Sequence, residues 1–269
     1  MGTPAYVYST ATLLRHVRVF RAALRGLDFL ACFAVKAAPN LALLALLARE
    51  GFGFDIVSGG ELFRARQAGG DPRKIVFSGV GKRQDEMAAA LEAGILQFNC
   101  ESEEELEQLS EVAARRKAVA KVALRVNPAV DARTHPHIAT ALSTSKFGIP
   151  ASRVRKAYRL AASLPGIRVV GVACHIGSQI ASVRPFVEAA GKMHVNSNRK
   201  KLIPTGIRRE PVECEAINSE LRDQLLVFRF EEVALQPEVL SGNDLWLVRF
   251  ETYDDLAAAT LFDLWKSLR

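Results

Sequence analysis

The sequence predicts an α/β fold, a parallel (β/α) barrel of the TIM type, and three observations support this prediction. Short apolar runs rich in β-branched residues recur between residues 29 and 176, as expected of strands that are buried on both faces. Helical segments separate these runs, and the first five runs follow one another at roughly 20 to 25 residues, the rhythm of a parallel βα repeat. No Gly-x-Gly-x-x-Gly turn follows an early strand, which disfavours a doubly wound sheet.

The predicted elements of the barrel follow one another in a regular order along the chain. The strands are predicted at residues 29–37, 54–58, 74–80, 95–100, 121–127 and 169–176. The helices between them are predicted at residues 41–49, 61–68, 83–93, 102–116 and 150–163. Ser102 and Glu105 have the spacing of a capping box at the start of one helix. About six of the eight strands of a full barrel are recognisable, so the predicted barrel is incomplete.

The chain divides into four predicted parts. Residues 1–28 are predicted to hold a strand at 3–8 and a helix at 10–25, and residues 29–192 form the barrel. Residues 193–236 are predicted to be an atypical, partly basic linker, since six lysines and arginines and no acid occur between residues 192 and 209. Further strands are predicted at 225–234 and 245–251, and a helix at 253–268, the last two within a final part at residues 237–269.

The composition is that of an ordinary globular protein, with 49% hydrophobic and 24% charged residues. The net charge of +7 is moderately basic, but the basic residues are scattered and aromatic residues are only 7%, which argues against a nucleic-acid partner. The four cysteines lie far apart, and neither a signal sequence nor a bilayer-spanning run is visible. We therefore expect reduced thiols, a cytoplasmic location and no membrane partner. His135 and His137 lack further ligands at metal spacing, so no metal is expected.

Polar or small residues stand where most of the predicted strands end, and in a (β/α) barrel these carboxyl ends form the mouth of the active site. Lys36 is one such residue, and a lysine there can form an imine with an aldehyde cofactor. His175 is another, and a histidine across the mouth can lie flat on the ring of that cofactor. Taken singly, a surface lysine and a hydrogen-bonded core histidine are the simpler explanations. Together and in this order, the two residues indicate pyridoxal-phosphate chemistry.

Six motifs in order resemble those of the fold-type III pyridoxal-phosphate decarboxylases, and most closely the diaminopimelate decarboxylases among them. The motifs are Thr3 to Tyr8, Phe33-Ala34-Val35-Lys36, Phe54 to Glu61, Leu124-Arg125-Val126-Asn127-Pro128, Ser145-Lys146-Phe147-Gly148-Ile149 and His175-Ile176-Gly177-Ser178-Gln179. The resemblance covers about residues 3 to 193. It implies pyridoxal 5'-phosphate as the cofactor, a small amino-acid substrate and a homodimer whose sites form between two chains.

The resemblance also implies a role for each matching residue. Lys36 is implied to bind the cofactor as an imine, and His175 to stack on the cofactor ring; these are the predicted catalytic residues. Asp55 is implied to hold the lysine nitrogen in its protonated form. Glu61 and Arg125 match polar residues of the same mouth. A helix-terminal acid and a strand-end ion pair are equally good explanations for these last two.

Two further residues complete the predicted site. Ser178 is implied to help bind the cofactor phosphate through its hydroxyl or nearby backbone N–H groups, and Lys146 resembles a lysine of the subunit interface. The chain also departs from the family. Ala38 and Ala141 replace residues that are usual within two motifs, and the Gly-Gly-Gly phosphate turn and the Glu-Pro-Gly-Arg motif are absent. We therefore expect that an internal segment is missing between about residues 193 and 236, and that residues 237–269 are the remnant of a C-terminal β domain with a terminal helix.

The resemblance leaves several functions open. The first is decarboxylation of meso-diaminopimelate to L-lysine with pyridoxal phosphate. The second is decarboxylation of ornithine or arginine by the same residues. The third is a single barrel that carries the cofactor without turnover, and the fourth is an inactive fragment or pseudoenzyme that associates with a partner chain. The missing phosphate motifs separate the first function from the fourth.

Overall fold

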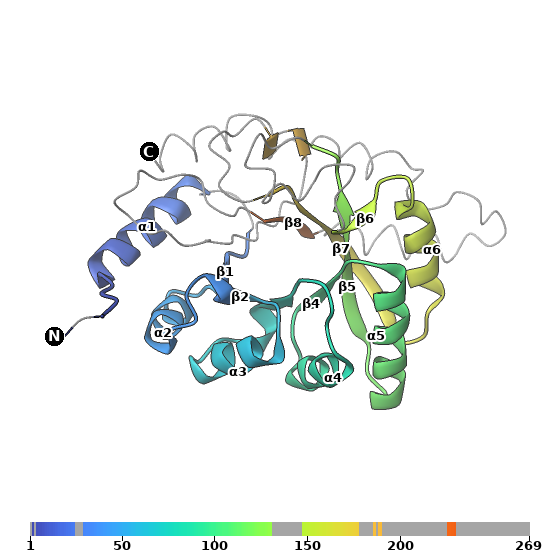
Figure 1. Cartoon of the computed structure of the whole chain (residues 1–269), viewed down its shortest axis with the longest axis horizontal. Coiled ribbons are helices and arrows are strands. Elements are labelled where there is room, and N and C mark those ends of the chain that lie inside the picture. Colours follow the sequence, from blue (N-terminus) through green and yellow to red (C-terminus); the bar gives the residue numbers. More distant parts are fainter. Residues whose placement is uncertain are drawn as a thin grey trace.

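The strands form one curved, parallel sheet with helices along its outer side. The structure is a computed structural model, and it describes residues 2, 4–24, 29–130, 147–177, 185–186, 188–189 and 225–229. The strand order is β1-β2-β3-β4-β5-β7-β8, and β6 pairs with β5 beside this path. Every strand pair is parallel. Helices α2 to α6 line the outer side of the curve (Figure 1). Among the described residues, β1 and β8 are the two ends of the sheet, so this part of the chain is an open (β/α) barrel.

The elements have the following bounds. The strands are β1 Cys32–Ala34, β2 Gly53–Ile56, β3 Ile75–Phe77, β4 Gln97–Cys100, β5 Ala120–Asn127, β6 Ile149–Pro150, β7 Ile167–His175 and β8 Leu225–Arg229. The α-helices are α1 Thr10–Ala23, α2 Leu41–Arg49, α3 Gly59–Gln67, α4 Gln84–Ala93, α5 Glu103–Arg116 and α6 Val154–Ser163. Two short 3-10 helices are η1 Val35–Ala37 and η2 Pro72–Lys74.

The six predicted barrel strands are confirmed as β1 to β5 and β7, and the predicted helices as α1 to α6. Two predicted strand segments are wrong. Residues 35–37 form the turn η1 instead of continuing β1, because β1 pairs with β2 only as far as Ala34 and Pro39 then leads the chain into α2. Residues 4–8 form no strand, since no described strand pairs with them, and Tyr6 is 92% exposed.

The strand predicted at residues 225–234 is confirmed at Leu225–Arg229, which is a seventh parallel strand on the sheet. Its residues pair with β7 from Gly171 opposite Leu225 to His175 opposite Arg229. This strand falls within the predicted linker 193–236, so at least these residues belong to the sheet. The remainder of that segment and the elements predicted at 245–251 and 253–268 lie outside the described residues. The division of the chain at residues 193 and 237 stays a prediction.

The two faces of the sheet differ in the size of their side chains. Large apolar side chains from the strands point outward and join the helices in the main core, among them the fully buried Phe54, Phe77 and Phe98. The opposite face carries a separate cluster of small residues, Cys32, Val76, Ala123 and Ala173. Side chains alternate between the faces with a period of two. Residues two positions after this inner cluster therefore also face inward, nearer the carboxyl ends of the strands.

The inner layer at the carboxyl ends is polar, in contrast to the apolar cluster beneath it. It contains Ser78 two residues after Val76, Arg125 two after Ala123 and His175 two after Ala173, together with Asp55 and Asn99. All five residues are buried. The period of the strands thus gathers polar groups at one end of the barrel, which is the end where a (β/α) barrel places its site.

The helices that follow β2 and β4 begin with the same cap. Ser58 accepts a hydrogen bond from the backbone N–H of Glu61 at 3.2 Å, and Ser102 accepts one from that of Glu105 at 3.1 Å. Each glutamate then reaches back to the backbone N–H of the residue before the cap, at Val57 and at Glu101. The caps hold the strand-to-helix turns in place, so the groups at the mouth rest on fixed backbone. No helix in the described part of the chain is long and apolar enough to cross a bilayer.

Candidate active site

Five of the seven predicted site residues lie in the described part of the chain, and all are near the carboxyl ends of the strands. Lys36 lies on η1 after β1, Asp55 on β2, Glu61 on α3, Arg125 on β5 and His175 at the end of β7. Ser178 and Lys146, which were predicted to bind phosphate and to lie at the subunit interface, are outside the described residues. The candidate site is therefore built from the ends of several neighbouring strands.

Lys36 is exposed, whereas the preceding Val35 is fully buried and anchors the turn in the core. Lys82, a second lysine near this end of the sheet, has a side chain that is 0% exposed. Its ammonium donates to the backbone carbonyls of Gly79 at 2.6 Å and Asn99 at 2.9 Å, and to Glu105 Oε1 at 2.6 Å. An ammonium has three hydrogens, so Lys82 is fully occupied. Of these two lysines, Lys36 is the one that a cofactor can reach.

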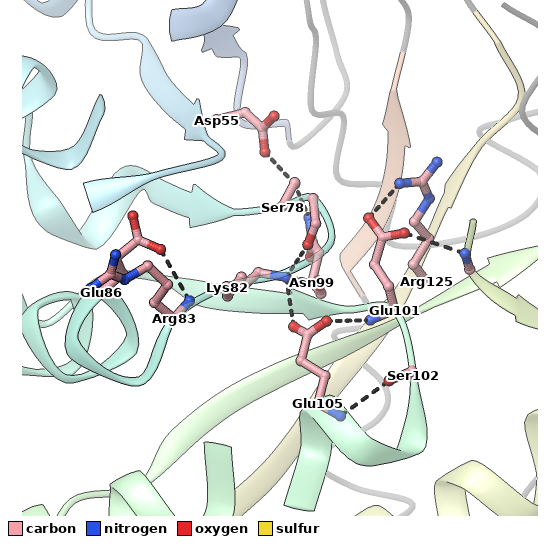
Figure 2. A network of polar contacts seen from close by, with 12 residues as sticks. Asp55, Ser78, Lys82, Arg83, Glu86, Asn99, Glu101, Ser102, Glu105 and Arg125 are labelled. Carbon is pink, nitrogen blue, oxygen red and sulfur yellow. Dashed lines mark hydrogen bonds and ion pairs between the residues drawn. The ribbon is translucent and has the colours of Figure 1, made fainter. Parts of the chain in front are cut away.

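Asp55 is 1% exposed and belongs to a chain of buried polar groups that crosses three strands. The hydroxyl of Ser78 donates to Asp55 Oδ1. The side-chain amide of Asn99 donates to Ser78 Oγ at 2.9 Å, and the amide of Gln97 donates to Asn99 Oδ1 at 2.8 Å. Figure 2 shows Asp55, Ser78 and Asn99 in succession across the inner face. Every donor in this chain points toward the carboxylate.

Arg125 is buried in an ion pair with Glu101, and Nη1 of the arginine lies 2.5 Å from Oε1 of the glutamate. The other carboxylate oxygen of Glu101 accepts the backbone N–H of Gly148 at 3.3 Å. The guanidinium also lies 5.6 Å from the centre of the Phe147 ring. The φ of Gly148 is +72°, and a Cβ at this position would lie 3.1 Å from the backbone carbonyl oxygen of Arg125. Glycine therefore suits this position. The predicted strand-end ion pair of Arg125 is present, and it orients the guanidinium.

Glu105 joins the two halves of this polar layer. Its Oε1 accepts from Lys82, and its Oε2 accepts the backbone N–H of Glu101 at 3.1 Å. Burial raises the pKa of the Glu105 carboxyl, and the positive charge of Lys82 opposes that rise. A continuous set of contacts therefore runs from Asp55 through Asn99, Lys82 and Glu105 to Glu101 and Arg125 (Figure 2).

Glu61 occupies a helix cap in this structure. Its Oε2 accepts the backbone N–H of Val57 at 2.7 Å, which holds the turn between β2 and α3. This matches the explanation of Glu61 as a helix-terminal acid. Its role toward a cofactor stays a prediction, and the cap uses one of its two carboxylate oxygens.

His175 is buried and ends β7, two residues after Ala173 of the inner apolar cluster. Its neighbour Cys174 faces the opposite side, within the main core, and burial raises the pKa of that thiol to about 12. Cys32 and Cys100 are also free and buried, as predicted for reduced thiols. Among the described residues, no group of three histidine, cysteine, aspartate or glutamate side chains gathers as a metal site.

Sequence reasoning missed most of the residues that support the predicted ones. Ser78, Asn99 and Glu101 belong to the polar residues at the predicted strand ends, but no motif distinguishes them, and no prediction included Lys82. The period of two along the strands could have placed Ser78 and Asn99 on the same face as Asp55. The partners of Lys82 lie on other βα units, so its burial has no signal in the local sequence.

The chain matches the family model of the pyridoxal-dependent decarboxylases, pyridoxal binding domain, over residues 10–207. It is 47% identical over 247 residues to the diaminopimelate decarboxylase of Pseudomonas aeruginosa, a match that covers 92% of this chain and 59% of that protein. It is 53% identical over 192 residues to the diaminopimelate decarboxylase of Vibrio cholerae, with 71% of this chain and 46% of that protein covered. The chain thus spans about half the length of these two relatives.

The fold is similar to that of solved diaminopimelate decarboxylases. The crystal structure of the Helicobacter pylori protein complexed with L-lysine has a TM-score of 0.75 and 31% sequence identity, covering 100% of this chain and 61% of that one. The crystal structure of the diaminopimelate decarboxylase from m. jannaschii in co-complex with L-lysine has a TM-score of 0.73 and 32% identity, covering 99% of this chain and 58% of that one.

Proposed function

The chain belongs to the pyridoxal-dependent decarboxylases, and from this premise we propose that it supplies the cofactor-binding part of an enzyme that converts meso-diaminopimelate to L-lysine. One observation carries the proposal: at the mouth of the barrel an exposed lysine follows β1 by two residues, and β1 ends opposite a buried carboxylate of β2. Ala34 of β1 is paired with Asp55 of β2, and Lys36 follows Ala34 by two residues. An accessible amine can attach an aldehyde cofactor covalently, and a fixed negative charge near it would stabilise the protonated nitrogen of that link.

The described residues fit pyridoxal 5'-phosphate in their chemistry. Lys36 would hold the cofactor through its amine, and Asp55 would stabilise positive charge on the attached nitrogen. His175, on the strand across the mouth, would present the flat face of its ring to the cofactor, and Arg125 would supply a fixed positive charge. Ser178 would bind the phosphate, and Lys146 would lie at the interface of a homodimer. When bound, pyridoxal phosphate supplies an electron-accepting ring.

The choice of diaminopimelate rests on the relatives and on the chemistry of the product. The two solved proteins described above are diaminopimelate decarboxylases in complex with L-lysine. L-lysine is what remains when meso-diaminopimelate loses one carboxylate as carbon dioxide and takes up one proton at the same carbon. The residues of this chain would orient the bond to the departing carboxylate, and exclude water from the buried side of the mouth.

An alternative is that this chain is inactive alone and acts with a partner chain. The observation that favours it is length, because the chain spans about half of the relatives that it matches. The two functions differ in what the purified chain does by itself. The first requires binding of the cofactor and release of lysine, and the second requires neither.

The experiment mixes the purified chain with pyridoxal phosphate and follows the visible absorbance of the lysine-bound cofactor. Lys36→Ala should abolish this absorbance, whereas Lys156→Ala, a change at an exposed lysine of α6, should leave it unchanged. Product analysis with diaminopimelate, ornithine and arginine then identifies the substrate, and sedimentation measures whether a homodimer forms. If the folded chain shows no such absorbance, the catalytic proposal fails for this chain and the partner-dependent alternative gains support.

A further inference from the structure

We propose that Ser78 is a positioning residue that holds the Asp55 carboxylate in its ionised, inward-pointing state. In this proposal Ser78 acts through Asp55, to which its hydroxyl donates. The inference rests on the proposed function, because that function gives Asp55 its role beside the cofactor nitrogen. Its test, however, needs neither cofactor nor turnover.

The geometry dictates where the hydroxyl hydrogen of Ser78 goes. A serine hydroxyl has one hydrogen to donate, and its oxygen can also accept. The amide of Asn99 donates to Ser78 Oγ at 2.9 Å, and this leaves the hydroxyl hydrogen to be directed at Asp55 Oδ1. The Asn99 amide is itself oriented, because its Oδ1 accepts from Gln97 at 2.8 Å. Each bond in the series therefore sets the direction of the next.

The series ends on a carboxyl group that is out of contact with bulk water. Asp55 is 1% exposed, and Gln97, Asn99 and Ser78 are all buried as well. Removing a carboxylate from water disfavours its ionised form, and hydrogen bonds from donors favour that form. A bond from a hydroxyl to a carboxylate is charge-assisted, and a series of aligned donors strengthens its last member. The hydrogen bond from Ser78 to Asp55 is thus strengthened by the aligned side-chain amides of Gln97 and Asn99.

The main chain of Asn99 adds a second constraint. Its carbonyl oxygen accepts from Lys82 at 2.9 Å, while its side chain donates to Ser78. Asn99 is consequently held at both its backbone and its side chain. This makes the end of β4 a fixed support for Ser78, and through it for Asp55.

Other titratable groups surround β2 on the elements packed against it. They are Cys32 on β1, Lys36 on η1, Arg73 and Lys74 on η2, and Glu61, Arg64 and Arg66 on α3. Burial and the negative charge of Asp55 raise the pKa of the Cys32 thiol, so this residue is a neutral neighbour. Four of the others are hydrogen-bonded elsewhere, Glu61 to Val57, Arg64 to Pro39, Arg73 to Asp71 and Lys74 to Gly51. Lys36 carries the charge that Asp55 is proposed to face.

The test is a pH titration of the Asp55 carboxyl carbon by ¹³C NMR in the full chain, with the signal assigned through Asp55→Asn. Ser78→Ala should raise the midpoint of the titration by about 1 to 2 pH units, the equivalent of one lost charge-assisted hydrogen bond. Ser78→Thr keeps the hydroxyl and should stay close to the original midpoint. Asn99→Asp is nearly isosteric and should raise the midpoint, because the new carboxylate competes for the hydroxyl hydrogen and adds a like charge.

The matched control is Ser110→Ala, at a buried serine whose hydroxyl donates to the carbonyl of Pro165 at 2.7 Å. It removes a hydroxyl of the same kind and should leave the Asp55 midpoint unchanged. An unchanged midpoint in folded Ser78→Ala and Asn99→Asp overturns the proposal; if Ser78→Ala does not fold, Asn99→Asp decides alone. Failure to bind pyridoxal phosphate would count only against the proposed function, because the titration uses the protein without cofactor.

Discussion

Lys82→Met should lower the free energy of unfolding by about 3–5 kcal/mol near pH 8, because it leaves a buried carboxylate without its counter-charge. Methionine keeps most of the apolar stem of the lysine and removes the ammonium. The side chain of Glu105 is 9% exposed, so water cannot replace the lost partner. The carbonyls of Gly79 and Asn99 lose a donor at the same time.

The sign of the pH dependence follows from the pKa of Glu105. Burial already raises that pKa, and Lys82 lowers it; removing Lys82 therefore raises it further. A carboxyl whose pKa is higher in the folded than in the unfolded chain binds more protons when folded. The contribution of such a carboxyl to the stability of the fold is fully present at pH values below the unfolded pKa, and it is lost as the pH rises through the folded pKa. The penalty of Lys82→Met should thus be smaller near pH 5 than near pH 8.

The assay is urea unfolding followed by far-ultraviolet circular dichroism at both pH values. Lys82→Met combined with Glu105→Gln should recover part of the loss and remove its pH dependence, since no buried charge remains. Near-equal stability of Lys82→Met and the unchanged chain at pH 8, within about 1 kcal/mol, would refute the reasoning. It would mean that Glu105 is solvated or partnered in some other way.

Two further predictions concern the interior near the sheet. Gly53→Ala should lower the free energy of unfolding by about 1–3 kcal/mol, since its Cβ would lie 2.1 Å from the Lys74 carbonyl oxygen and 2.7 Å from Cys32 Sγ; thermal unfolding measures this, and an unchanged midpoint contradicts it. Cys32, Cys100 and Cys174 should resist thiol reagents in the folded chain and react once urea unfolds it, because burial raises the pKa of all three thiols. Peptide mapping by mass spectrometry reads out each site, and rapid labelling of any of them in the folded chain would contradict the burial.

The strands and helices of the barrel could be predicted because their signals are local. Strands buried on both faces are short and apolar, and the helices between them carry caps such as Ser102 with Glu105. The strand predicted at residues 29–37 was too long, because the end of a strand depends on its neighbour. Pairing of β1 with β2 stops at Ala34, and this places Lys36 on a turn.

From the residues alone, Lys36, Asp55, Arg125 and His175 could be predicted as parts of one site, because their types and their order along the chain match one family. The tertiary structure alone decided what each of them contacts. The register of β2, β3 and β4 brings Ser78 and Asn99 to Asp55, and the fold buries Lys82 against Glu105. Hydrogen-bond partners that lie on different βα units are set by strand register and burial. Strand register and burial cannot be predicted from the residues of one partner alone.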